Sequence, residues 1–293
     1  MSNKTYQIII PVDFGEQSLI AVRQSFNMAK LTSSELTLLH VIDNDLMNAL
    51  QSKIFTKSDL QEQHLAGVKE QLEELANQIR QESGVKVNTR IMEGKIYDAI
   101  VDVSAEEDAG LIIMGTMGAV GLKKRILGSN ASRVVREAVC PVITIKGKEH
   151  RFGIKHILLP LDLTKETKEK VNKAINIARM FGSVIHIVTI VESKDEFINN
   201  KLTRQMDQVS EHIVEAGIQC TSEFVKGGDV VDEILKVAER TQSDLIMIMT
   251  QQEVGFTDLF ISSAAQEVIN RSEVPVLSIR PMPRKDTTTF TIQ

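Results

Sequence analysis

Short apolar runs alternate with longer stretches of helical periodicity along the first half of the chain. Apolar side chains recur at helical spacing in residues 16–31, 58–82, 96–108 and 129–138. The runs between them are rich in β-branched residues and read YQIIIPV, ELTLLHV, KVNTRIM, LIIMG and PVITIK. Because parallel strands need helix-length connections, five strands alternating with four helices predict an α/β fold with a parallel sheet covered on both faces.

The second half of the chain repeats this pattern. The stretch YQIIIPVDFGEQS, which begins at Tyr6, returns as KHILLPLDLTKET from Lys155, at an offset of 149 residues. Two later stretches, AGLIIMGTMG and CPVITIK, return at an offset of 134 residues as SDLIMIMTQQ and VPVLSIR. The chain is therefore predicted to be a tandem duplication.

We expect two doubly wound domains, each with a five-stranded parallel sheet of strand order 3-2-1-4-5 and four helices. Residues 1–147 form the first domain and residues 152–281 the second, with a polar linker over residues 146–155. Residues 282–293 are a polar tail, for which no further element is predicted.

The glycines after the fourth strand of the first domain are the main candidate for chemistry. In open sheets of this kind, ligands bind beyond the carboxyl ends of the strands where the strand order reverses, here between strands one and four. Asp13 ends strand one, and strand four leads into Gly115, Gly118, Gly121 and Gly128, with Ser129 opening a helix. Glycine permits positive φ and leaves backbone N–H groups open to an anion, and a helix N-terminus favours phosphate. The loop is thus predicted to bind phosphate, although it is neither a Walker A nor a G-x-G-x-x-G sequence.

Composition and charge narrow the class of protein. Hydrophobic residues make up 42% and charged residues 25%, as in ordinary globular proteins, and no apolar run approaches the length of a membrane span or a signal peptide. The net charge is −5 and neither half is basic, so nucleic acid is not an expected partner. The two cysteines, Cys140 and Cys220, are expected in the core and suit a cytoplasmic location. No metal site is predicted.

These residues resemble the ATP-binding branch of the universal stress protein family. The motif of that family, G-x2-G-x9-G-(S/T), is met at Gly115, Gly118, Gly128 and Ser129, and both halves carry the Pro-x-Asp of strand one. The resemblance implies the fold of the adenine nucleotide alpha hydrolases, with ATP, alone or with Mg, as the ligand. It also implies that the fifth strands pair, as a pseudo-dimer within one chain or between copies in a homo-oligomer. The residues expected to bind are Pro11, Val12, Asp13 and Val41 for the adenosine part, Met114, Gly115, Met117 and Gly118 for the ribose and phosphates, and Gly128, Ser129 and Asn130 for the triphosphate.

The second half departs from the motif at the glycines. At the 134 offset, the equivalents of Gly115, Gly118, Gly128 and Asn130 are Met249, Gln252, Ser262 and Ala264. The basic run at residues 123–125 becomes Thr-Asp-Leu, which removes a field favourable to phosphate. We therefore expect one nucleotide site per chain, in the first domain, with a structural second domain.

Each feature also has a structural interpretation. The glycines fit a tight turn, and an aspartate before a helix, such as Asp13 or Asp162, commonly caps it. Lys123, Lys124 and Arg125 fit a solvated surface, and residues 44–57 fit either a lid or a surface connection. Met114 fits core packing and His40 a packed histidine.

The sequence points to binding rather than to catalysis. Hydrolysis of a nucleotide needs a group that positions water and carboxylates that hold metal, and only Asp13 is expected near the glycines. Ser129 has no neighbouring base, so no catalytic residue is assigned. The prediction is a regulatory ATP-binding protein of the stress response. A slow ATPase or autokinase and a nucleotide-free adaptor remain the alternatives.

Overall fold

The computed structural model describes residues 6–43, 57–116, 128–146, 153–162, 167–191, 195–250 and 263–280. The strands of the first half are β1 (Gln7–Pro11), β2 (Glu35–Asp43), β3 (Val87–Gly94), β4 (Leu111–Gly115) and β5 (Val142–Ile145). Its helices are α1 (Glu16–Thr32), α3 (Lys57–Ser83), α4 (Ile96–Glu106) and α5 (Ser129–Glu137). The strands of the second half are β6 (His156–Pro160), β7 (Val184–Val191), β8 (Cys220–Lys226), β9 (Leu245–Met249) and β10 (Val276–Ile279). Its helices are α6 (Thr167–Phe181), α7 (Glu196–Glu215), α8 (Val230–Arg240) and α9 (Ser263–Arg271).

All of these strands belong to one ten-stranded sheet, ordered β3-β2-β1-β4-β5-β10-β9-β6-β7-β8. Each half is parallel and has the predicted order 3-2-1-4-5, which confirms the fold class. The predicted helices match closely, whereas β2 and β3 each run two residues beyond their predicted ends. The reason is that Ile42 pairs with Glu93 and Asp43 with Gly94, which extends both strands together.

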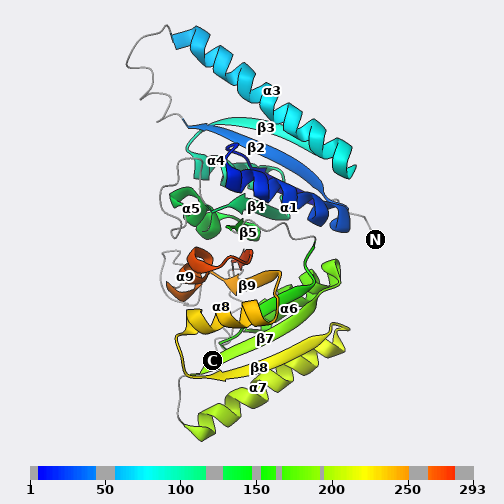
Figure 1. Cartoon of the computed structure of the whole chain (residues 1–293), viewed down its shortest axis with the longest axis vertical. Coiled ribbons are helices and arrows are strands. Elements are labelled where there is room, and N and C mark those ends of the chain that lie inside the picture. Colours follow the sequence, from blue (N-terminus) through cyan, green and yellow to red (C-terminus); the bar gives the residue numbers. More distant parts are fainter. Residues whose placement is uncertain are drawn as a thin grey trace, which may run out of the picture.

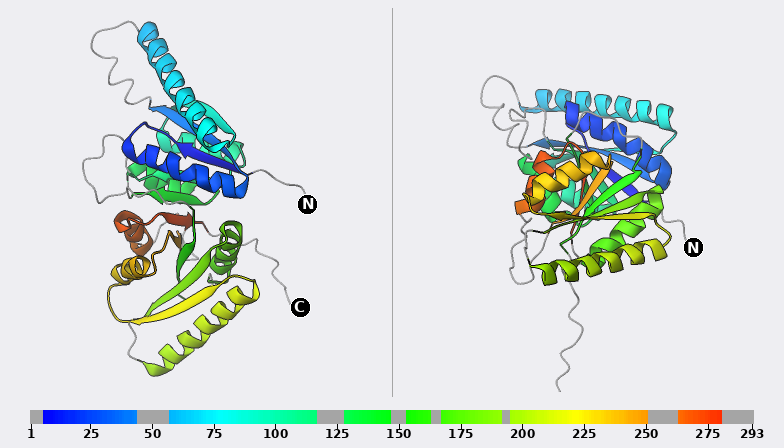
Figure 2. Two further views of the ribbon diagram at one scale, coloured as in Figure 1. Left: turned by 45° about the vertical axis from the view of Figure 1, so that its right-hand side comes forward. Right: turned by 60° about the horizontal axis from the view of Figure 1, so that its bottom comes forward.

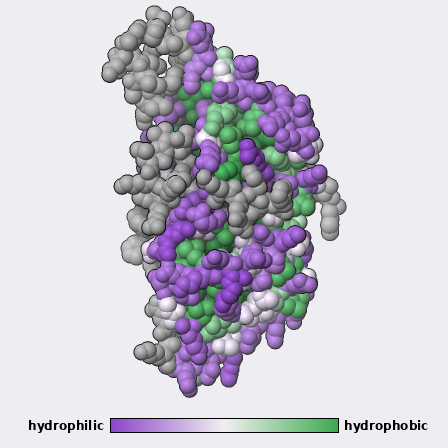
Figure 3. Space-filling model, viewed as in Figure 1, coloured by the Kyte–Doolittle hydropathy of each residue, from purple (hydrophilic) through white to green (hydrophobic). Residues whose placement is uncertain are grey.

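Two apolar layers hold the helices on the two faces of the sheet. One layer joins the sheet to α1, α3, α6 and α7 through residues such as Ile20, Leu72 and Ile213. The other joins it to α4, α5, α8 and α9 through residues such as Val134 and Ile234. Figure 2 shows helices on both faces, and Figure 1 shows α3 and α7 at opposite ends of the molecule. On the face seen in Figure 3, hydrophobic surface shows in patches between hydrophilic residues.

The two halves meet at their last strands, which pair antiparallel. Leu277 of β10 lies opposite Ile143 of β5, and both side chains are almost fully buried. Lys146 donates a hydrogen bond to the carbonyl oxygen of Asn270 at 2.7 Å, which ties the end of β5 to the end of α9. The junction therefore makes one continuous sheet from two repeated units within a single chain.

In each half, an ion pair joins the third strand to the helix that follows it, but the acid and the base are reversed between the halves. In the first half, Arg90 of β3 pairs with Glu106 of α4 at 2.5 Å. In the second half, Glu223 of β8 pairs with Arg240 of α8 at 2.6 Å. The acid and the base have thus exchanged places between the strand and the helix.

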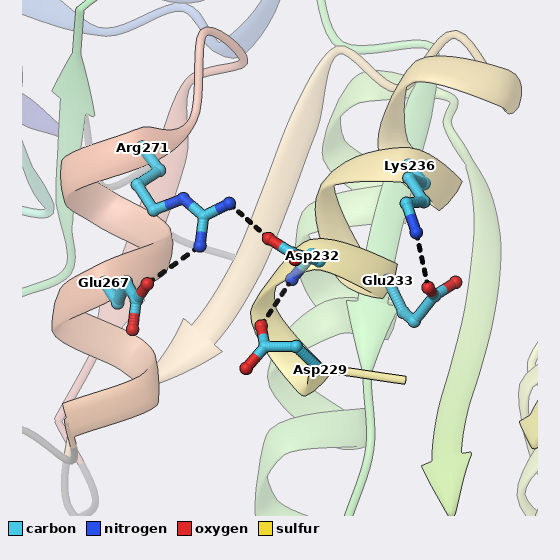
Figure 4. Close-up of polar contacts among 6 residues, drawn as sticks. All are labelled: Asp229, Asp232, Glu233, Lys236, Glu267 and Arg271. Carbon is cyan, nitrogen blue, oxygen red and sulfur yellow. Dashed lines mark hydrogen bonds and ion pairs between the residues drawn. The ribbon is translucent and has the colours of Figure 1, made fainter. Parts of the chain in front are cut away.

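A further polar cluster ties α8 to α9 (Figure 4). Asp229 caps α8 by accepting a hydrogen bond from the backbone N–H of Asp232 at 2.9 Å. The guanidinium of Arg271 bridges Asp232 on α8 and Glu267 on its own helix, α9. In the first half, the corresponding helix pair is joined by Arg133 of α5, whose guanidinium stacks 4.3 Å from the ring centroid of Tyr97 on α4.

Candidate functional site

The loop after β1 is an ordered turn built around Asp13. The Oδ1 atom of Asp13 accepts a hydrogen bond from the backbone N–H of Gly15 at 2.9 Å, and its carboxylate lies at the surface. The residue that caps α1 is Gly15, without a side-chain hydrogen bond, so the alternative of Asp13 as the cap is wrong. The hydroxyl of Ser18 donates to the carbonyl oxygen of Gly15 at 3.0 Å and closes the turn. The carboxylate is therefore held at the carboxyl end of β1, as expected.

His40 of β2 fastens this loop from the neighbouring strand. Its Nδ1 lies 2.7 Å from the carbonyl oxygen of Val12, and because a carbonyl only accepts, Nδ1 carries the proton and donates. Burial is the main cause that lowers the pKa of His40 below its ordinary value. The ring of Phe14 packs against the imidazole at 5.3 Å between centroids, with Phe14 itself at a φ of 59°. His40 is thus a packed histidine, as the structural interpretation held, and it positions the backbone beside Asp13.

Gly115, at the end of β4, is a glycine because α1 lies against it. A Cβ atom there would be 2.9 Å from both the carbonyl carbon and the Cβ atom of Gln17. The residue is not among those with a positive φ, so it is the missing side chain and not an unusual backbone that this position requires. The missing side chain lets the first turn of α1 pack on β4. This contact draws the Asp13 loop toward the end of β4.

Gly128 joins the end of the glycine loop back to the end of β4. Its backbone N–H donates to the carbonyl oxygen of Thr116 at 2.8 Å, and a Cβ atom at Gly128 would lie 3.1 Å from that oxygen. Its φ of −56° is ordinary. Met117, Gly118 and the basic residues 123–125 lie outside the described residues. The hydroxyl of Thr116 is buried and has no hydrogen-bond partner in the described part of the chain.

The start of α5 presents backbone donors at the same edge of the sheet. Gly128 is the N-cap and makes no side-chain hydrogen bond, and the first turn contains no acidic residue. The N–H groups of Ser129 and Asn130 fall in that first turn, where a helix supplies no acceptor. Ser129 is exposed, so this helix end can receive an anion from solvent. The charge of the helix dipole favours the same kind of ligand.

The remaining site residues divide between core and edge. Val12 and Met114 are almost fully buried in opposite apolar layers, so the core interpretation of Met114 is confirmed. Only their backbones are available to a ligand. Pro11 and Val41 lie partly buried at the ends of β1 and β2. The structure thus gathers nine of the eleven expected residues at one edge of the first half, in and beside the elements β1, β2, β4 and α5.

The second half holds a lysine at its equivalent edge, which sequence reasoning missed. Lys170 of α6 donates a hydrogen bond from Nζ to the carbonyl oxygen of Pro160, the last residue of β6. Burial lowers the pKa of this amine to about 8, opposed by the nearby charge of Asp162. The equivalent residue of the first half, at the 149 offset, is Ala21, which is fully buried. A lysine at a helix position that is alanine in the first half is the signal that could have found it.

Other kinds of site receive no support from the described residues. They contain no group of three or more His, Cys, Asp or Glu side chains placed to hold a metal. Within the same residues, no helix combines the length and the apolar character needed to cross a bilayer. Both cysteines carry free thiols; Cys140 is buried, as expected, whereas Cys220 is only partly buried.

Three comparisons relate the chain to known proteins. The family model described as "Universal stress protein family" matches residues 5–146 and again residues 153–280. A universal stress protein of Methanocaldococcus jannaschii is 33% identical over 145 residues, covering 48% of this chain and 81% of that protein. A universal stress protein of Mycolicibacterium smegmatis is 22% identical over 293 residues, covering 94% and 97%. The crystal structure of a universal stress protein from Archaeoglobus fulgidus has a similar fold, with a TM-score of 0.75 at 22% identity, covering 94% and 99%.

Proposed function

Because the chain belongs to the universal stress protein family, we propose that it is a cytoplasmic stress-response protein that binds ATP in its first half. The site lies between the carboxyl ends of β1 and β4. The observation that carries the proposal is the start of α5, which has no acidic residue in its first turn and lies at the same edge of the sheet as the Asp13 loop. The glycine motif that resembles the ATP-binding branch lies between them in sequence.

The residues present suit the two ends of a nucleotide. Asp13 brings a carboxylate that accepts hydrogen bonds, as ribose or adenine donors require, and Val41 adds apolar surface at the neighbouring strand end. The N–H groups at the start of α5 suit the phosphates. The buried hydroxyl of Thr116 lacks a partner at the base of the same loop, and such a group costs free energy unless a ligand or solvent satisfies it.

The same edge of the second half is built differently. Met249 replaces Gly115, and the ammonium of Lys170 occupies the space beside the end of β6. One of its three N–H donors is used by the carbonyl oxygen of Pro160. These differences support a single nucleotide site per chain, with the second half in a structural role.

The role we propose is regulatory. Asp13, the carboxylate beside the predicted phosphate loop, is engaged with the N–H of Gly15, and Ser129 has no base beside it in sequence. A bound nucleotide would act by favouring one arrangement of the chain over another, to the extent that it binds that arrangement more tightly.

The test is calorimetric titration of the full chain with ATP, comparing Asp13→Ala with Asp162→Ala. Both aspartates follow equivalent strands, so comparing them separates a loss specific to the proposed site from a general effect of removing an aspartate. We expect one equivalent of ATP per chain, at least tenfold weaker binding in Asp13→Ala and no change in Asp162→Ala. Absence of binding to the unmodified chain would favour the nucleotide-free adaptor. Steady phosphate release, or label on Ser129 after incubation with Mg-ATP, would favour the slow ATPase or autokinase.

A further inference from the structure

An apolar cavity lies where the two halves meet, on the side of the sheet covered by α1 and α6. Its volume is about 140 Å³. Ile143 and Leu277, which face each other in the β5–β10 pairing, both line it. Leu111 and Leu245, which are equivalent residues of β4 and β9, also line it. The cavity therefore lies at the centre of the pseudo-symmetry, with walls from both halves.

The walls are apolar, and they differ between the halves. The end of α6 contributes Ile177, Met180 and Phe181. The end of α1 contributes Thr32, the equivalent of Phe181, and Ser34 follows it, with their two hydroxyl oxygens 2.6 Å apart. Among the described residues, no charged side chain lines the cavity. The α6 side thus brings larger apolar side chains than the α1 side, where the two hydroxyls are hydrogen-bonded to each other.

Two large apolar side chains remain exposed where the cavity opens. Tyr6 is 48% exposed and Met180 is 44% exposed, and both line the cavity. Apolar surface that a ligand removes from water contributes about 25 cal/mol per Å² to binding. The opening is therefore a place where a small apolar molecule gains free energy by entering.

The cavity is separate from the proposed nucleotide site. Tyr6 precedes β1 and Asp13 follows it, and the five residues of β1 span about 16 Å at the usual rise of a strand. The cavity lies at the amino ends of β1 and β4, whereas the nucleotide site lies at their carboxyl ends.

We propose that this cavity binds a small uncharged apolar molecule about the size of one aromatic ring. A cavity of about 150 Å³ lined by Leu, Ile and Phe takes up benzene in another protein. An ionised ligand of the same size is disfavoured, because burying a charge without a partner costs much more than the apolar contacts return. The lining comes from both halves, so a bound molecule stabilises the junction between them.

The proposal does not depend on ATP binding, and the full chain is tested without nucleotide. The first measurement is a methyl NMR titration with phenol, and with benzoate as the charged control of similar shape. We expect saturable shifts with phenol at the methyl groups of Ile143, Ile177 and Leu277. Ile234, which packs on the opposite face of the sheet, should not shift. The midpoint of thermal unfolding should rise with phenol concentration, because the ligand binds the folded state. Phenol shifts that do not saturate, or equal shifts with benzoate, would overturn the proposal.

Variants locate the binding within the cavity. Ile177→Phe adds volume to the α6 wall and should weaken phenol binding at least tenfold. Ile198→Phe makes the same change at an exposed position of α7 and should leave binding unchanged. Thr32→Ile fills the cavity from the α1 side and serves as a second blocking variant if Ile177→Phe does not fold. Undiminished phenol binding by a folded blocking variant would show that the molecule binds elsewhere and would overturn the assignment.

Discussion

The first turn of α1 lies against β4 so closely that a Cβ atom at Gly115 would be 2.9 Å from the carbonyl carbon of Gln17. We therefore expect Gly115→Ala to lower the free energy of unfolding by about 1–3 kcal/mol, because overpacking forces the helix from the strand. Urea unfolding measures this change. Gly67→Ala is the control, because no described atom lies within 4 Å of a Cβ there and α3 should gain up to about 1 kcal/mol from alanine. Equal effects of the two changes would refute the packing explanation.

The sequence predicts that only the first half binds ATP, and variants of Gly118 and of its equivalent, Gln252, test this prediction. Gly118→Val should abolish ATP binding, because a branched side chain would stand between the phosphates and the backbone. Gln252→Val should leave binding unchanged. Calorimetric titration measures both variants, and an equal loss in both would show that the second half contributes to the site.

The contribution of Lys170 to the free energy of unfolding should be less unfavourable in alkali than at neutral pH. Its pKa falls from an ordinary 10.5 to about 8 on folding, which corresponds to about 3 kcal/mol at most. This penalty is present in full below pH 8, where the folded chain holds the charged amine. It disappears above about pH 10.5, where the amine is neutral in both states.

Replacing Lys170 with methionine should therefore raise the free energy of unfolding at pH 7 by about 1–3 kcal/mol, less the lost hydrogen bond to Pro160. The gain should shrink as the pH rises toward 10.5. Urea unfolding at both pH values measures it, with Lys168→Met, at an exposed position of the same helix, as the control. A gain of the same size at both pH values would mean that charge burial is not its cause.

His40 should weaken the protein in acid. Its pKa is lowered in the folded state, chiefly by burial, so below pH 6.5 the unfolded chain takes up the proton more readily. The contribution of His40 to the free energy of unfolding has its full value above pH 6.5, and it is lost as the pH falls through the pKa of the folded state. NMR titration of the imidazole measures the pKa directly, and a value at or above 6.5 would contradict the expectation. His40→Gln should flatten this part of the stability profile.

The repeat, the strand order and nearly every helix boundary of the first half could be predicted from sequence, because the period of apolar residues reflects which faces are buried. The structural role of individual residues could not be predicted in the same way. Gly115 and Gly128 suggested a phosphate-binding loop, and only the fold shows that Gly115 also accommodates a helix. What packs against a residue depends on the tertiary fold, which residue type alone does not specify.

Two polar residues at the equivalent edges of the two halves illustrate the same limit. Asp13 precedes a helix, and sequence could not tell a cap from the turn that it forms with Gly15. Lys170 lies on a helix face that should be apolar, and only the fold shows its amine at the end of β6. Both positions were visible in the sequence, but their hydrogen-bond partners were not.

The exchanged ion pairs bear on how a duplicated gene keeps two distinct halves. Recombination between the repeats would yield a hybrid unit with β3 from one copy and α8 from the other. That unit would place Arg90 against Arg240, and the reciprocal product would place Glu223 against Glu106. Each hybrid would lose an ion pair and gain a repulsion, a change of about 1 kcal/mol or less for side chains as exposed as these.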